Sequence, residues 1–330
     1  MLIHHRLEDV ELALGMRTKP NINTKESVKS SAKSSAKATP KRLASVGRNT
    51  TQDLQSVSAK LSQIDVSGCP NASSFILQGS AKTATHKFFL LPDGSGTATS
   101  YSRIPKLSND YVAFGLDCPF MRKPKDFTIG VRGVAQLYIN EIKRRQPEGP
   151  YLLGGWSAGG VIAYEVCCQL INSGNEVKRL VLLDAPSPKM ASEPLPPGLH
   201  IFFDEIGLLG NGAKIPGWLL DHFASTIKAL SEYEATPMAK GKAPKTFAIW
   251  CREGVCGDPG SKRPPVPPGG EPSPMKFLLN HRTDFGDYGW NELVGSVETG
   301  VMDGNHFSMM QDQHAEALGA LIRQGLGISA

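Results

Sequence analysis

Apolar residues recur along the chain in short runs that alternate with longer amphipathic segments from about residue 66 onward. Apolar positions at helical spacing predict helices at residues 129–145, 161–171 and 313–326. The short runs predict strands at residues 75–77, 87–91, 111–114, 151–153, 179–183, 245–250 and 296–299. Four consecutive apolar residues follow Arg179, which is typical of a strand inside a parallel sheet. The alternation predicts a doubly wound α/β fold, with a mostly parallel sheet and helices on both of its faces.

Two segments interrupt this alternation. Residues 194–238 have a helical pattern bracketed by prolines, where a simple crossover between two strands would need fewer residues. We expect this segment to form a helical lid over a functional site at the sheet. Residues 257–274 are rich in proline and glycine, and we expect them to form a flexible surface insertion without chemistry.

The front of the chain has a different composition from the rest. Residues 17–65 contain few aromatic residues and many Lys, Ser, Ala and Thr, so they predict a flexible linker. Before them, residues 6–15 have the pattern of the last turns of an amphipathic helix that ends at a glycine. We therefore expect one catalytic domain at residues 66–330, preceded by a helical remnant at residues 1–16 and a linker.

The basic character of the chain lies in its front part. Residues 1–60 hold 11 Lys and Arg against 5 Asp and Glu, a balance of +6. The remaining 25 basic and 26 acidic residues sum to −1, so nothing in the charge of the expected domain favours nucleic-acid binding.

The absence of several sequence patterns indicates the expected localisation and cofactor use. It shows no bilayer-spanning apolar run and no secretory leader, so we expect a cytoplasmic protein that does not bind membranes. The six cysteines show no metal-ligand spacing and are expected to be reduced thiols. No dinucleotide fingerprint or phosphate-binding loop is present, so we expect no cofactor.

The strongest chemical signal is a G-x-S-x-G motif centred on Ser157. The motif follows a predicted strand and precedes a predicted helix, the context in which a sharp turn exposes a nucleophilic serine. We expect side chains at Gly155 or Gly159 to clash with the neighbouring strand or helix. Ser157 is therefore the candidate nucleophile.

A serine nucleophile needs a histidine base and an acid that orients it. His306 lies directly after the last predicted strand, where this fold delivers its base. Asp184 ends the strand after the nucleophile helix, and Glu253 and Asp258 follow the next strand. We favour Asp184, because a carboxylate at the end of a buried strand is held rigidly, whereas Glu253 and Asp258 border the proline-rich insertion.

The negative charge that develops on a substrate oxygen needs backbone N–H donors. One is expected from Ala158, directly after the nucleophile, and a second from the loop after the strand at 87–91. In that loop, at residues 91–96, Gly94 or Ser95 is the candidate donor. The same residues also have the composition of an ordinary turn.

Several motifs occur in an order that resembles a known family. The chain is similar to the thioesterase/Claisen-cyclase domains of fungal non-reducing polyketide synthases, over roughly residues 66–328. The motifs that carry this resemblance are FFLLPDGSG at 88–96, GGWSAGG at 154–160, LLD at 182–184, RTDFG at 282–286, GW at 289–290 and GNHF at 304–307. The resemblance implies an α/β-hydrolase fold and a triad of Ser157, Asp184 and His306.

The resemblance also implies a substrate and a partner. The substrate would be a polyketide acyl chain, held as a thioester on the phosphopantetheine arm of an acyl carrier protein supplied in trans. Residues 6–15 resemble the end of a carrier domain, so the chain would be either a standalone thioesterase or a truncated synthase. Release would follow an acyl-Ser157 intermediate, by hydrolysis or by Claisen-type ring closure. Two other interpretations are a small-ester esterase or lipase and a noncatalytic remnant of a synthase.

Overall fold

A seven-stranded sheet organises the part of the chain that the computed structural model describes, namely residues 65–190, 195–196, 198–209 and 215–329. The strand order is β1-β3-β2-β4-β5-β6-β7, and only the pairing of β1 with β3 is antiparallel. The strands are β1 (Ser73–Gln78), β2 (His86–Leu91), β3 (Tyr111–Asp117), β4 (Tyr151–Trp156), β5 (Val177–Leu183), β6 (Lys245–Cys251) and β7 (Val297–Met302). The mostly parallel sheet is thus confirmed.

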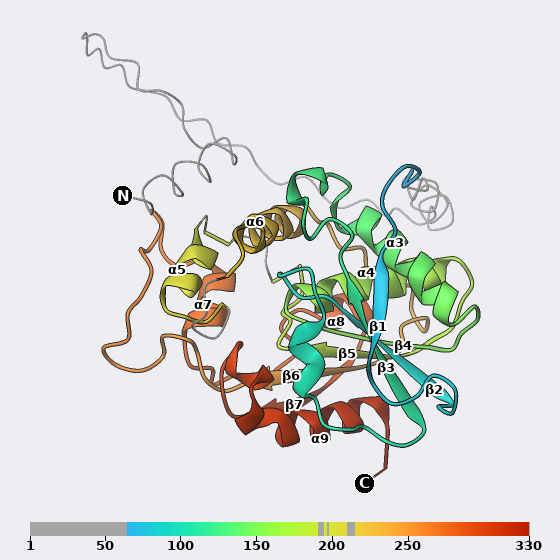
Figure 1. Ribbon diagram of the computed structural model, residues 1–330. Helices are drawn as coiled ribbons and strands as arrows, with labels where there is room; N and C mark the ends of the chain where they lie inside the picture. The colour runs from blue at the N-terminus through green and yellow to red at the C-terminus, as the bar shows by residue number, and fades with distance from the viewer. Residues whose placement is uncertain (1–64, 191–194, 197, 210–214, 330) are drawn as a thin grey trace, which may run out of the picture. The chain divides into compact units, whose positions relative to one another are not determined.

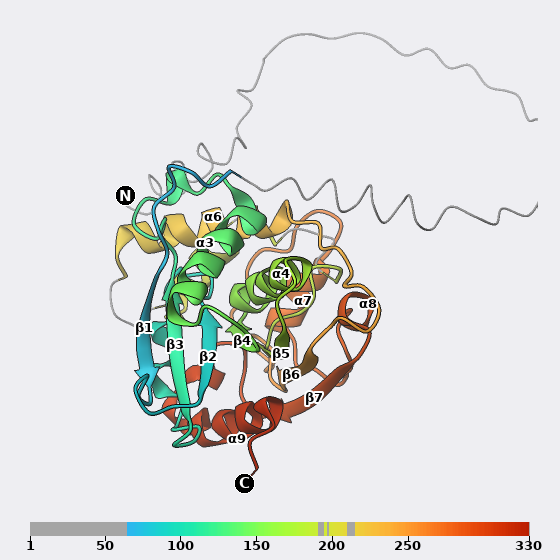
Figure 2. The same ribbon diagram turned by 90° about the vertical axis from the view of Figure 1, so that its right-hand side faces the viewer.

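Helices cover both faces of this sheet (Figures 1 and 2). α3 (Gly130–Arg145) and α4 (Ala158–Asn172) pack on one face, and α9 (Ala315–Leu326) packs against β5, β6 and β7 on the other. Along β2, Phe89 and Leu91 point into the core below α3 and α4, while Phe88 and Leu90 point into the core below α9. This alternation follows from the two-residue period of a strand. Short 3₁₀ turns lie at Thr99–Arg103, Pro124–Asp126, Ser308–Met310 and Asp312–His314.

The predicted elements match the observed ones closely. Six predicted strands lie entirely within observed strands, and the seventh begins one residue before β7. Two short helices were missed, α7 (Ser273–Leu279) and α8 (Asn291–Val294). α7 begins at the end of a proline-rich stretch, and α8 has only four residues, so neither contains enough turns to show a helical period.

The segment predicted to be a lid contains two helices. α5 (Leu199–Glu205) and α6 (Gly217–Ser231) lie between β5 and β6 in the chain and pack against each other. The proline-rich insertion at residues 257–274 has more ordered structure than the sequence predicted. Its last two residues belong to α7, and the Arg263 side chain hydrogen-bonds to the Cys256 carbonyl, Glu271 and Asn280.

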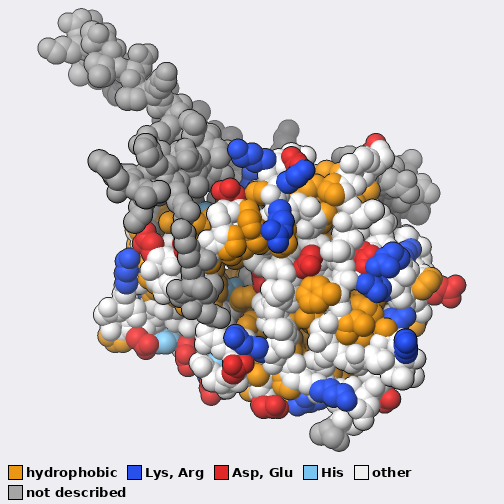
Figure 3. Space-filling view, viewed as in Figure 1, with side chains coloured by type: hydrophobic (Ala, Val, Ile, Leu, Met, Phe, Trp, Pro, Cys, Tyr) orange, Lys and Arg blue, Asp and Glu red, His pale blue; other side chains and the backbone are white. Residues whose placement is uncertain are grey.

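The remaining expectations concern the front of the chain and the surface. The predicted remnant helix at 1–16 and the linker at 17–65 lie outside the described residues, apart from Asp65. All six cysteines are free. Among the described helices, none has the length and apolar character needed to cross a membrane. On the face seen in Figure 3, Lys and Arg side chains are interspersed with Asp and Glu.

Candidate active site

Ser157 sits in the sharp turn between β4 and α4 with a backbone φ of +57°. This left-handed region is costly for a residue with a side chain, and such strain concentrates at functional sites. A Cβ on Gly155 would overlap the Gly159 backbone, and a Cβ on Gly159 would lie 2.6 Å from the carbonyl oxygen of Leu91. The expected clashes at both glycines are confirmed, so only glycine fits either position.

The structure brings Ser157, His306 and Asp184 into one hydrogen-bonded row. The Ser157 hydroxyl lies 2.9 Å from Nε2 of His306, and Nδ1 of His306 lies 2.8 Å from Oδ2 of Asp184. A carboxylate can only accept, so Nδ1 carries the proton and Nε2 is the acceptor for the hydroxyl. This arrangement can remove a proton from Ser157 as it attacks an acyl group.

Asp184 is completely buried and has a cationic neighbour, Arg282, which the sequence analysis gave no role. The Arg282 guanidinium donates to both carboxylate oxygens, at 2.5 and 2.7 Å, and the Cys251 N–H donates to Oδ1 at 3.0 Å. Burial raises the pKa of Asp184, but the hydrogen bonds and charges of Arg282 and His306 outweigh burial and lower the pKa to about 2. Arg282 therefore keeps the Asp184 carboxylate ionised although it is buried away from solvent. As a result, Nδ1 of His306 retains Asp184 as its hydrogen-bond acceptor.

Replacing Arg282 with Met is expected to lower the free energy of unfolding at neutral pH by about 3–5 kcal/mol, because it leaves a buried, uncompensated carboxylate. A group with a lowered folded-state pKa contributes stability above its unfolded pKa near 3.8, and that contribution fades as pH falls toward about 2. The difference between the two proteins should therefore be largest above pH 4 and shrink in more acidic solution. Denaturant unfolding at pH 7 and pH 3 measures it.

An Arg282→Lys protein serves as the control, since it keeps the positive charge but loses the bidentate hydrogen bond to Asp184. It should lose less stability than Arg282→Met and retain more activity at low pH. A stability difference between wild type and Arg282→Met that stays constant with pH would contradict this account of Asp184.

The competing candidates for the acid lie elsewhere. Glu253 is exposed. Asp258 is also exposed and pairs with His281 at 3.2 Å. Among the described residues, Asp184 is the only carboxylate hydrogen-bonded to His306.

The loop after β2 provides one clear candidate for an oxyanion donor. The Ser95 N–H donates to Oδ1 of Asp93 at 2.7 Å, so it is already occupied. Of the two alternatives in this loop, the structure favours Gly94. In the described part of the chain, neither the Gly94 N–H nor the N–H of Ala158, the first residue of α4, has a hydrogen-bond acceptor. Both remain available for a negatively charged oxygen above Ser157.

The lid helix α6 contacts this loop directly. Nδ1 of His222 donates to the Gly94 carbonyl at 3.1 Å, and a Cβ on Gly94 would lie 2.7 Å from the Phe223 ring. A Cβ on Gly96 would lie 2.6 Å from the His222 ring. The absence of side chains at Gly94 and Gly96 therefore lets α6 approach this loop closely.

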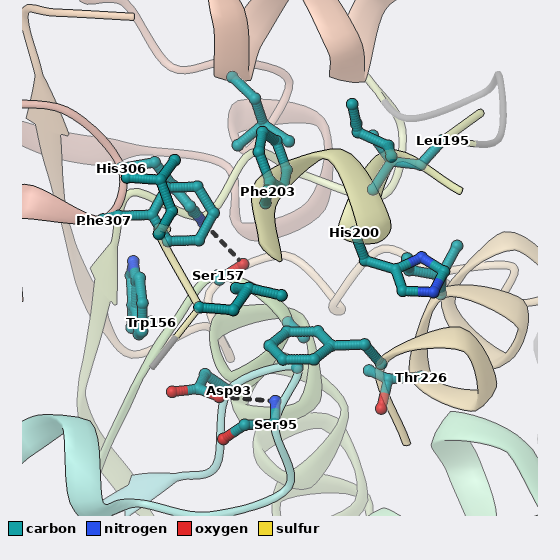
Figure 4. A pocket seen from close by; sticks show the side chains of 18 of the residues that line it. Asp93, Ser95, Trp156, Ser157, Leu195, His200, Phe203, Thr226, His306 and Phe307 are labelled. Atoms are coloured by element: carbon teal, nitrogen blue, oxygen red, sulfur yellow. Dashed lines mark hydrogen bonds between the residues drawn. The ribbon is translucent and has the colours of Figure 1, made fainter. Parts of the chain in front are cut away.

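A cavity of about 230 Å³ opens beside Ser157 and is covered by α5 and α6 (Figure 4). Its wall is mainly apolar. The lid contributes Leu199, Phe203, Leu219, Phe223, Ile227 and Leu230. A second, smaller space of about 110 Å³ on another side of Ser157 is lined by Val161, Pro186, Pro188 and Pro274. Ser157 thus lies where the two spaces meet, and an apolar acyl chain matches the wall of the larger one.

Sequence reasoning missed four polar residues around this site: Arg282, Asp93, His200 and His222. Arg282 and Asp93 were within the motifs that carried the family resemblance, but a motif does not say which atoms they contact. His222 is on a lid helix, 128 residues away in sequence from its partner Gly94. Within the described residues, no group of three or more His, Cys, Asp or Glu is placed to hold a metal ion.

Comparison with known proteins supports the family resemblance. The thioesterase domain family model matches residues 86–215. A non-reducing polyketide synthase of Preussia isomera, Preu8, is 53% identical over 327 residues, which are 97% of this chain. A non-reducing polyketide synthase of Zymoseptoria tritici, PKS1, is 48% identical over 99% of this chain. The chain spans only 15% and 14% of the length of these two relatives.

Solved structures share the fold at low sequence identity. The NocB thioesterase domain, solved as a covalent complex with a fluorophosphonate nocardicin G analogue, matches with a TM-score of 0.57 at 19% identity, covering 78% of this chain and 99% of that domain. The RedJ thioesterase of Streptomyces coelicolor matches with a TM-score of 0.55 at 16% identity, covering 75% of this chain and 93% of that one. These matches confirm the α/β-hydrolase type of fold. The family rests on the sequence matches: with the thioesterase model over residues 86–215 and 53% and 48% identity to the two polyketide synthases, the chain belongs to the thioesterase domains of fungal non-reducing polyketide synthases.

Proposed function

We propose that this chain releases a polyketide acyl chain from the phosphopantetheine arm of an acyl carrier protein, through an acyl-Ser157 intermediate. The observation that carries the proposal is the row of hydrogen bonds from Ser157 through His306 to Asp184, next to a cavity of mainly apolar lining. The 53% identity to a non-reducing polyketide synthase supports the substrate class.

The first half of the reaction transfers the acyl chain to the protein. His306 takes the Ser157 proton at Nε2 as the oxygen attacks the thioester carbonyl, and Asp184 stabilises the imidazolium that forms. The N–H groups of Ala158 and Gly94 stabilise the oxyanion. His306 then gives its proton to the departing thiol of the carrier. These steps use side chains and backbone of this chain, and we propose no metal or redox cofactor.

The second half removes the acyl chain from Ser157. Water activated by His306 would give a free acid, whereas a carbanion within the chain would attack the ester carbonyl and close a ring. The same triad serves both outcomes, and the choice depends on whether the lid helices α5 and α6 fold the acyl chain and keep water away from the ester.

Incubating the protein with an acyl-carrier thioester tests the proposal. We expect the peptide that contains Ser157 to gain the mass of the acyl group, and the carrier to recover a free thiol. Mass spectrometry of the small-molecule product then distinguishes an acid from its cyclised form, which is lighter by one water for the same acyl chain.

Two other functions predict different results. A small-ester esterase would turn over simple esters efficiently yet fail to acylate from the carrier. A noncatalytic remnant would form no adduct with either substrate. The complete triad geometry argues against the noncatalytic remnant. The identity to a non-reducing polyketide synthase favours the thioesterase over the esterase.

A further inference from the structure

Buried polar atoms without partners concentrate at the cavity beside Ser157. Among the described residues, five buried side-chain nitrogen atoms have no hydrogen-bond partner. Three of the five belong to Trp156 and His200, which both line this cavity. Folded proteins leave few buried polar atoms unpaired because each costs free energy, so such a concentration points to a ligand that supplies the missing bonds.

His200 is the most exceptional of these residues. It lies on lid helix α5, only 4% of its surface is exposed, and neither ring nitrogen has a partner. In Figure 4 its ring extends from α5 on the side of the cavity away from His306 and Trp156. Burial lowers the pKa of His200 to about 4, so its ring is neutral near pH 7 and offers one N–H donor and one acceptor.

The other polar side chains of the cavity already have partners within the protein. They are Asp93, Ser95, Ser157, Thr226 and His306. Apart from these residues, Trp156 and His200 itself, the cavity wall is apolar, and much of it comes from α5 and α6. A group that binds His200 must therefore be an isolated polar substituent on an otherwise apolar ligand.

We propose that His200 recognises an oxygen substituent on the acyl chain, such as a ketone, enol or phenol oxygen, at a distance from the thioester carbonyl. Both ring nitrogens are closed off from the cavity in this conformation, so the side chain must turn before one of them meets the ligand. The neutral imidazole would then donate to a ketone oxygen or accept from an enol or phenol hydroxyl. A saturated chain would bury His200 without a partner and would be bound less tightly. The inference rests on the proposed thioesterase function and assigns a selectivity residue to its acyl site.

Binding to a Ser157→Ala protein tests the inference without requiring turnover. The probes are N-acetylcysteamine thioesters of decanoic acid and of its 5-oxo, 7-oxo and 9-oxo derivatives, which move one ketone along a constant chain. We expect at least one oxo isomer to bind about ten- to a hundredfold more tightly than the decanoyl thioester. Adding His200→Leu should remove this preference and leave decanoyl binding within about threefold.

Matched variants separate hydrogen bonding from shape. His200→Asn or His200→Gln should restore part of the preference, because each keeps an amide donor and acceptor near one ring nitrogen. His86→Leu, the same substitution at an exposed position on β2, should change nothing. Circular dichroism of each variant checks that the fold is retained.

The outcomes distinguish this inference from the function on which it rests. Equal binding of all four thioesters by the Ser157→Ala protein, or an equal loss for all four in His200→Leu, would overturn the role of His200. A binding preference that depends on His200, without any acyl-Ser157 adduct in the wild-type protein, would support the oxygen site and overturn the thioesterase mechanism.

Discussion

Changing Ser157 to Ala, His306 to Ala or both is expected to lower kcat for a carrier-bound acyl thioester by about 10⁶-fold in each case. The effects should not add, because the serine oxygen and the base act in one step and either is useless without the other. A residual rate above the uncatalysed reaction should persist, since the N–H groups of Gly94 and Ala158 still bind the oxyanion. Single-turnover release of the carrier thiol measures these rates.

If the fold reduction in kcat of the double variant equalled the product of the two single reductions, it would contradict the expectation that Ser157 and His306 act in one step. It would mean that His306 and Ser157 act in separate steps, despite the 2.9 Å between Nε2 and the hydroxyl oxygen.

Replacing Asp184 with Asn is expected to lower kcat by about 10⁴-fold while leaving KM nearly unchanged. The amide can present its NH₂ group to Nδ1 of His306, which then becomes the acceptor and places the proton on Nε2. In that tautomer the imidazole cannot remove the Ser157 proton. Steady-state kinetics near pH 8 provide the measurement.

Glu253→Gln is the matched control, because it makes the same carboxylate-to-amide change on the alternative acid. We expect its kcat to match that of the wild-type protein. If Glu253→Gln abolished activity and Asp184→Asn preserved it, Asp184 would not be the acid, and its contact with His306 would be structural.

The sequence predicted the sheet, and it selected three candidate residues that hydrogen-bond to one another, because these signals are local. The apolar run after Arg179 marks a strand buried on both faces, and the glycines around Ser157 mark a turn that admits no side chain. The order of Ser157, Asp184 and His306 along the chain then follows the fold that those elements form.

The missed features depend on contacts that no local pattern encodes. Arg282 meets Asp184 from a position 98 residues away, and nothing in its neighbouring sequence distinguishes a buried arginine from an exposed one. The choice between Gly94 and Ser95 depended on a single hydrogen bond, that of the Ser95 N–H with Asp93. His200 lies in the segment predicted to be a lid, and its two unpaired nitrogens become apparent only when the surrounding side chains are in place.

The contact between α6 and the loop after β2 couples the position of a lid helix to the geometry of the candidate oxyanion loop. His222 holds the Gly94 carbonyl, and Phe223 packs against the space that a Cβ on Gly94 would occupy. A displacement of α6 away from this loop would break the hydrogen bond and release the peptide that follows the Gly94 N–H, the candidate oxyanion donor. A ligand that binds in the cavity and holds α6 in place would therefore also hold the loop after β2 in its present geometry.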